Sequence, residues 1–72
     1  MSLEMRNVFS KRVSKIGWDD STGELVVMWI SGKFSRYAGV PKALANQVMN
    51  SASVGTALST EIEGKYDHLP GY

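Results

Sequence analysis

Lysine and arginine alternate with aromatic residues in the segment GKFSRYAGVP, residues 32–41. Lys33 and Arg36 are cations that can contact phosphate, whereas Phe34 and Tyr37 carry rings on which nucleic-acid bases can stack. The same residues fit an ordinary strand with a core aromatic ring and charged edges that deter aggregation. Aromatic residues are common in strands by propensity alone, so the sequence favours this second interpretation for the rings.

The net charge is only +1, but the charges are unevenly distributed along the chain. Cations dominate the part before residue 43, whereas Glu61, Glu63 and Asp67 make the last part acidic. A basic first part fits an anionic partner, and it fits equally two copies of the chain that meet head to tail. A solvated basic segment is the simpler alternative. The candidate phosphate-binding residues are Arg6, Lys11, Arg12, Lys15, Lys33 and Arg36.

Other motifs point only weakly to a site. Residues 53–56, SVGT, have small side chains and N–H groups that could hold a phosphate, but a serine helix cap with a close-packed glycine is favoured. Residues 19–24 lack the ligand spacing of a calcium loop, so we expect no metal site. His68 stands beside Asp67 near the chain end, with no Ser or Cys nucleophile in a recognisable motif around it. We therefore expect no catalysis and no cofactor.

The length of 72 residues predicts one domain with a small core. Cysteine is absent, so no disulfide supports this core, and self-association is the remaining inexpensive stabiliser. Because a secreted domain of this size usually needs disulfides, and because no signal peptide or membrane span is visible, we expect a cytoplasmic protein without a membrane partner. Residues 1–7 are expected to be a disordered lead-in, residues 8–68 the domain, and residues 69–72 a tail.

The elements that must position the candidate residues follow from periodicity and turn signals. Residues 13–19, 24–30 and 34–38 are predicted strands, separated by turn formers around Gly23 and Gly32. A first helix begins at Pro41 and runs to about residue 51, and Ser53 is the predicted N-cap of a second helix. The predicted fold class is α+β: a three-stranded antiparallel β-meander followed by two α-helices packed on one face of the sheet.

The length of the second turn decides which side chains share a face. A two-residue loop would put Phe34 and Arg36 beside Val27 and Trp29, whereas a three-residue loop would put Ser35 and Tyr37 there. Periodicity alone leaves both registers open.

The spacing of many residues resembles the KTSC domain family, which occurs at the C-terminus of some lysyl-tRNA synthetases and as small stand-alone bacterial or phage proteins. The resemblance covers roughly residues 8–66 and implies a domain of unestablished activity that is suspected of binding RNA. The residues that carry it are Ser10, Val13, Ile16, Gly17, Trp18, Asp19, Leu25, Val27, Trp29, Gly32, Tyr37, Val40, Pro41, Ser53, Gly55, Ile62 and Tyr66.

The resemblance also bears on the register. The family has a Y-x-Y pair in its third strand, and here Ser35 replaces the first tyrosine, so either a stacking platform is lost or neighbours must fill a core gap. The family pattern favours the three-residue loop, which places Tyr37 in the core. The opposite face of the sheet is then unusually apolar, and such a face usually marks an interface. The candidate interface residues are Val26, Met28, Ile30 and Phe34.

Two functions follow as hypotheses. The first is a small non-enzymatic module that binds RNA through the basic residues named above. The alternative is a protein-interaction module that forms a homodimer, or docks on another protein, through the apolar outer face of the sheet.

Overall fold

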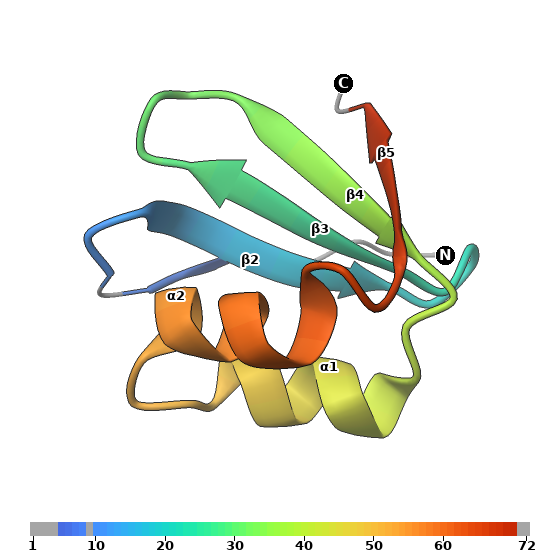
Figure 1. Cartoon of the computed structure of the whole chain (residues 1–72). Helices are drawn as coiled ribbons and strands as arrows, with labels where there is room; N and C mark the ends of the chain where they lie inside the picture. The colour runs from blue at the N-terminus through green and yellow to red at the C-terminus, as the bar shows by residue number, and fades with distance from the viewer. Residues whose placement is uncertain (1–4, 9, 71–72) are drawn as a thin grey trace.

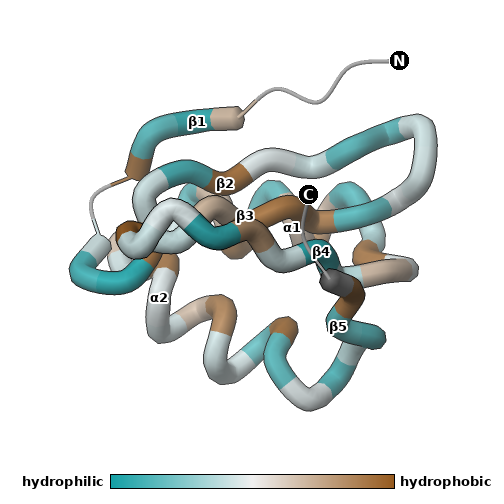
Figure 2. The backbone as a smooth tube through the Cα atoms, turned by 90° about the horizontal axis from the view of Figure 1, so that it is seen from above, coloured by the Kyte–Doolittle hydropathy of each residue, from teal (hydrophilic) through white to brown (hydrophobic). Residues whose placement is uncertain are grey.

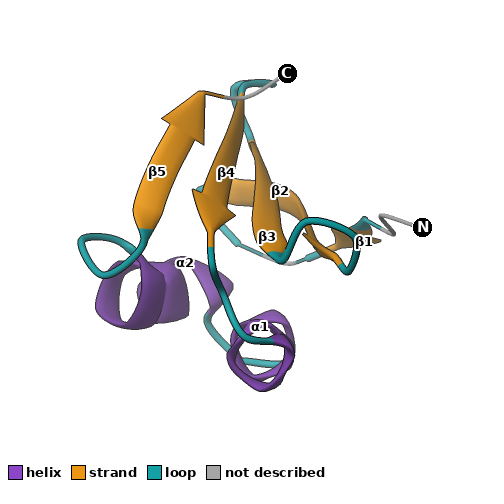
Figure 3. Ribbon diagram, turned by 90° about the vertical axis from the view of Figure 1, so that its right-hand side faces the viewer, coloured by secondary structure: helices purple, strands orange, loops and turns teal. Residues whose placement is uncertain are grey.

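The structure is a computed structural model that describes residues 5–8 and 10–70 of the chain. A five-stranded antiparallel sheet forms one layer, and the helices form a second layer on one of its faces (Figures 1 and 3). The elements are β1 (Arg6–Asn7), β2 (Val13–Asp19), β3 (Glu24–Trp29), β4 (Phe34–Ala38), α1 (Lys42–Met49), α2 (Val54–Ala57), the π-helical turn η1 (Leu58–Ile62) and β5 (Asp67–Pro70). Among the described residues, no helix has the length and apolar character needed to span a membrane.

The core lies between the sheet and the helices. β3 is central in the strand order and is coloured hydrophobic along much of its length in Figure 2. Leu25 and Val27 point from it toward the helices, where Leu58 and Ile62 are also fully buried. The buried residues of this core are Val13, Ile16, Leu25, Val27, Tyr37, Val40, Ala45, Val48, Val54, Leu58 and Ile62. Burial of this apolar surface is the main favourable term in folding.

The three-residue loop sets the register of the β3–β4 hairpin, as the family pattern indicates. Leu25 lies opposite Tyr37 and Val27 lies opposite Ser35. The Gly32 N–H donates to the Trp29 carbonyl at 2.9 Å, and Gly32 has φ of +92°, a conformation that a side chain disfavours. This turn therefore places Tyr37 in the core, where it is 4% exposed.

Replacing Gly32 with alanine should destabilise the domain by about 1–2 kcal/mol, because the left-handed backbone region is unfavourable for residues with a Cβ. The substitution Ser31→Ala, at the neighbouring exposed turn position, is the matched control and should change stability little. Urea unfolding followed by tryptophan fluorescence measures both. Equal stability of the two variants would mean that this turn does not need its glycine.

The prediction of three strands is wrong, because β1 and β5 extend the sheet on its two edges. β1 lies inside the predicted lead-in, where Arg6 pairs with Ile16. β5 crosses the predicted boundary between domain and tail, and its His68 pairs with Tyr37. A two-residue strand carries no periodic signal, and Pro70 is tolerated because β5 lies at an edge. The rest of the predicted lead-in and tail, residues 1–4 and 71–72, lies outside the described residues.

The second predicted helix differs from the structure in part. Ser53 is the N-cap residue of α2, as predicted, but its side chain makes no capping bond to a backbone N–H, and its hydroxyl donates to the Thr56 hydroxyl at 3.0 Å. After one α-helical turn the chain widens into η1, where the Glu63 N–H donates to the Leu58 carbonyl at 2.8 Å. The Ser59 hydroxyl donates to the Gly55 carbonyl at 3.2 Å, and such competing side-chain bonds commonly bend helices.

The outer face of the sheet contains one fully buried side chain. Val26 points away from the helices, yet none of its surface is exposed. Its cross-strand neighbours are Gly17 and Arg36, and Arg36 forms an ion pair with Glu24 at 3.3 Å. Because Glu24 precedes Val26 by two residues on the same face, the Arg36 side chain must run beside Val26. Its aliphatic stem can shield the valine there.

Candidate anion-binding cleft

Three connections meet at one end of the sheet, at the left of Figure 1: β1 to β2, β3 to β4, and α1 to α2. The first two are joined by a backbone hydrogen bond of 2.8 Å from the Ile30 N–H to the Arg12 carbonyl. They carry the exposed residues Lys11, Arg12 and Lys33, which we call the basic end. No acidic residue occurs in residues 5–18 or 25–60, so the segments that meet here carry no acidic side chain.

A cleft of about 470 Å³ opens at the basic end, between the β1–β2 connection and the start of α2. Its chemistry is that of an anion site, because the described residues that line it supply two cations and four hydroxyl groups and no carboxylate. The residues that line it are Ser10, Lys11, Arg12, Ala52, Ser53, Gly55, Thr56 and Ser59.

The cleft depends on a close approach between Ser10 and Gly55. The Ser10 hydroxyl accepts hydrogen bonds from the backbone N–H groups of Arg12 and Val13, at 3.2 and 3.3 Å, and so fixes the loop that carries the cations. A Cβ at Gly55 would lie only 3.2 Å from the Ser10 oxygen. Glycine therefore lets α2 approach the loop without a clash.

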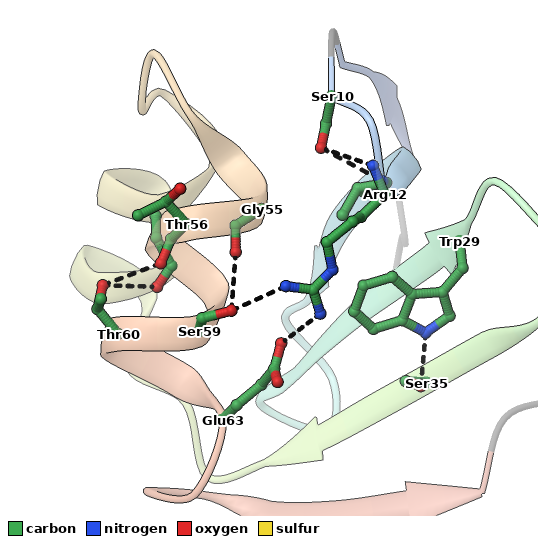
Figure 4. A network of polar contacts seen from close by, with 11 residues as sticks. Ser10, Arg12, Trp29, Ser35, Gly55, Thr56, Ser59, Thr60 and Glu63 are labelled. Carbon is green, nitrogen blue, oxygen red and sulfur yellow. Dashed lines mark hydrogen bonds and ion pairs between the residues drawn. The ribbon is translucent and has the colours of Figure 1, made fainter.

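Arg12 is the most constrained cation of the basic end (Figure 4). Its Nη1 donates to the Ser59 hydroxyl at 2.9 Å, and its Nη2 donates to the Glu63 carboxylate at 3.1 Å. Its guanidinium carbon lies 5.3 Å from the centroid of the Trp29 ring, within the range of a cation–π interaction. The Trp29 indole N–H donates to the Ser35 hydroxyl at 2.8 Å, which fixes the ring.

The six predicted phosphate-binding residues do not share one face. Lys11, Arg12 and Lys33 lie at the basic end, whereas Arg6 lies in β1 and donates to the Asn50 side chain at 3.2 Å. On the outer face, Lys15 lies opposite Met28 and Arg36 lies opposite Val26, the latter cation being paired with Glu24. Half of the predicted set therefore lies at the basic end, and of these three residues Lys11 and Arg12 line the cleft.

The four predicted interface residues differ in what they offer to a partner. Val26 is fully buried, so its surface is not accessible for docking. Met28 and Phe34 are half-buried, and Ile30 is 60% exposed at the tip of the β3–β4 hairpin. The accessible apolar surface of the outer face is therefore smaller than the sequence indicates.

Tyr37 and His68 stack on each other away from the cleft, with ring centroids 5.1 Å apart. Burial raises the pKa of the Tyr37 phenol, and the charge of Glu63 raises that pKa further, so the ring stays neutral in the core. Tyr37 is thus unavailable as a platform for a base.

Sequence reasoning missed Ser10, Ser59 and Glu63, which complete or adjoin the cleft. Ser53, Gly55 and Thr56, which the sequence offers as a weaker phosphate site at the start of a helix, line the cleft. The sequence does contain one indication of a cationic site. No acidic residue occurs in residues 5–18 or 25–60, and the segments that form the basic end therefore carry no negative charge of their own.

These features define a small α+β domain with one antiparallel sheet and a cationic cleft at one end of it. Residues 9–66 match the KTSC domain family, so the chain belongs to that family, whose function is not established. The fold is similar to the crystal structure of a KTSC domain protein from Yersinia pestis, with a TM-score of 0.88 and 25% sequence identity. That similarity covers 96% of this chain and 97% of the other. No curated protein matches the chain.

Proposed function

We propose that this protein is a non-enzymatic module that binds RNA through phosphate groups at the basic end. The observation that carries the proposal is the cleft itself, where Lys11 and Arg12 meet four hydroxyl groups and no carboxylate from the described residues. Lys33 extends the positive charge along the neighbouring hairpin. Cations and hydroxyl groups are the usual partners of phosphate oxygens in nucleic-acid complexes.

The chemistry favours contacts to the backbone over contacts to bases. Among the described residues, no aromatic side chain lines the cleft, and the Trp29 ring is covered by the Arg12 guanidinium. Of the two rings that the sequence offers for stacking, Tyr37 is buried in the core, and Phe34 lies on the outer face opposite Met28. Contacts to phosphate fix position and register but read no sequence, so we propose binding with little sequence preference.

The test compares two double variants by fluorescence anisotropy with a labelled single-stranded RNA at 50 and 150 mM salt. Three phosphate contacts imply that the wild-type affinity falls about tenfold over this range. Lys11→Gln with Lys33→Gln removes two cations of the basic end, which should weaken binding and flatten the salt slope by about 1.4.

The matched control is Lys15→Gln with Lys42→Gln, which makes the same change in net charge at the outer face and at the start of α1. This control should bind almost as the wild type does. If both double variants lost RNA affinity equally, the binding would depend only on net charge and not on the basic end. An RNA affinity that does not change with salt concentration would reject phosphate binding.

Homodimerisation through the outer face is the rival function. Its supporting observation is the exposure of Ile30 at the hairpin tip. With Val26 buried, the remaining surface rests on Met28, Ile30 and Phe34. Single exposed apolar residues are common on monomeric proteins, so we rank this function second.

A further inference from the structure

We propose that Glu63 acts as a built-in competitor for the anion at the cleft, so that its carboxylate sets the affinity of Arg12 for phosphate. This inference rests on the proposed function and names a residue that regulates the same site. Glu63 holds one Nη of Arg12 at 3.1 Å, although it does not line the cleft. An anion that enters the cleft therefore meets an arginine whose charge is already partly neutralised.

The geometry puts Arg12 between two possible partners. Its side chain lines the cleft, whereas its guanidinium is directed to Ser59 and Glu63 on the η1 side (Figure 4). A guanidinium has five N–H donors, and these two bonds engage only part of that set. A phosphate in the cleft that binds Arg12 therefore either displaces the Glu63 carboxylate or lies close to it and is repelled by its negative charge.

Ser59 and Glu63 both reach Arg12 from η1 and its C-terminal end. They are four residues apart, and residues at that spacing share a face of a helix. The hydrogen bond from the Glu63 N–H to the Leu58 carbonyl spans five residues, so η1 is wider than an α-helix. Such wide turns occur frequently at functional sites.

Competition by Glu63 has a modest expected size, because the pair is partly exposed to solvent. The side chains of Arg12 and Glu63 are 50% and 36% exposed, and exposed ion pairs are weak. Removing the negative charge of Glu63 should therefore tighten phosphate binding at Arg12 by about 1.5- to 5-fold.

The experiment follows the Nε–Hε resonance of Arg12 by NMR while inorganic phosphate is added to the full chain. Glu63→Gln removes the charge and keeps an oxygen that can accept the Arg12 hydrogen bond. Glu61→Gln is the matched control, since it makes the same charge change two residues earlier in η1, at a residue that is similarly half-buried. We expect a lower dissociation constant in Glu63→Gln, with Glu61→Gln close to the wild type.

A second variant isolates the role of Arg12. In the Glu63→Gln background, Arg12→Gln should abolish the gain, which a general change in net charge would not do. Because this variant has no Arg12 Nε–Hε resonance, the backbone amide resonances of Ser10, Lys11 and Gly55 report phosphate binding in all the variants. Equal gains in Glu63→Gln and Glu61→Gln, or an Arg12 resonance that phosphate never shifts, would overturn the inference.

The RNA measurement separates this inference from the proposed function. Suppose that Glu63→Gln binds phosphate more tightly at Arg12, but the wild type binds no RNA. This result would reject RNA binding and would support the role of Glu63 as a competitor. Salt-sensitive RNA binding at the basic end, with no gain for either ligand in Glu63→Gln, would reject the competitor alone.

Discussion

Val26→Asp is expected to leave the chain unfolded. Val26 has no exposed surface, although it faces away from the helices, and it lies beside the ion pair of Arg36 and Glu24. A carboxylate in this position would be buried and would have to compete with Glu24 for the single Arg36 cation, and burial of an imperfectly paired charge costs several kcal/mol. A domain of this size has only a few kcal/mol of stability to lose. Circular dichroism and an amide NMR spectrum would record the loss of the fold.

The matched control is Ile30→Asp, which introduces the same charge at the exposed tip of the β3–β4 hairpin. This variant should keep the fold and the molecular mass in solution of the wild type, as measured by sedimentation velocity. A Val26→Asp variant that folds as a monomer while the wild type sediments as a dimer would support the outer-face interface instead.

Leu58→Ala should lower the free energy of unfolding by about 2–5 kcal/mol, because it leaves a cavity in a core that relaxes only in part. Leu58 is fully buried at the junction of α2 and η1, where the helical layer meets the sheet. The measurement is urea unfolding followed by the fluorescence of the two tryptophans. An unchanged dependence on urea concentration would show that only stability has changed.

Leu44→Ala provides the comparison for this loss. Leu44 lies on α1 and packs against the core, but part of its surface remains exposed. The same truncation there removes less buried area, so its effect should be less than half of that for Leu58→Ala. Equal losses at the two positions would mean that burial at η1 is not what stabilises the helical layer.

The three central strands could be predicted because their residues carry strong local signals. The bounds of β2 and β4 agree with the predicted strands at residues 13–19 and 34–38, and β3 ends one residue early. The sequence does not predict the edge strands β1 and β5, because they form by hydrogen bonding to the backbone of β2 and β4 and have no clear side-chain alternation of their own. The π-helical turn was missed for a similar reason, since hydroxyl groups that bond to the preceding turn leave the hydrophobic spacing unchanged.

The candidate site could be predicted in part. A β-bulge between Val13 and Lys15 explains why Lys15 lies away from the cleft. Simple alternation would place Val13 and Ile16 on opposite faces, yet both are buried in the core. The extra residue of the bulge re-phases the strand and puts Lys15 on the outer face beside Met28. The face on which Lys15 lies therefore depends on the β-bulge in β2, which the spacing of residues in the sequence does not indicate.

The order of the strands in the sheet is their order in the chain, and this has a consequence for how the sheet opens. The β2–β3 and β3–β4 pairings are closed by turns of a few residues, so the loop entropy that opposes them is small. β5 pairs with β4 only after the chain has passed through both helical segments, so its docking closes a much longer loop. We infer that β5 is the neighbour of β4 whose local detachment costs less, and its release would expose the backbone edge of β4 to strand exchange with a second copy.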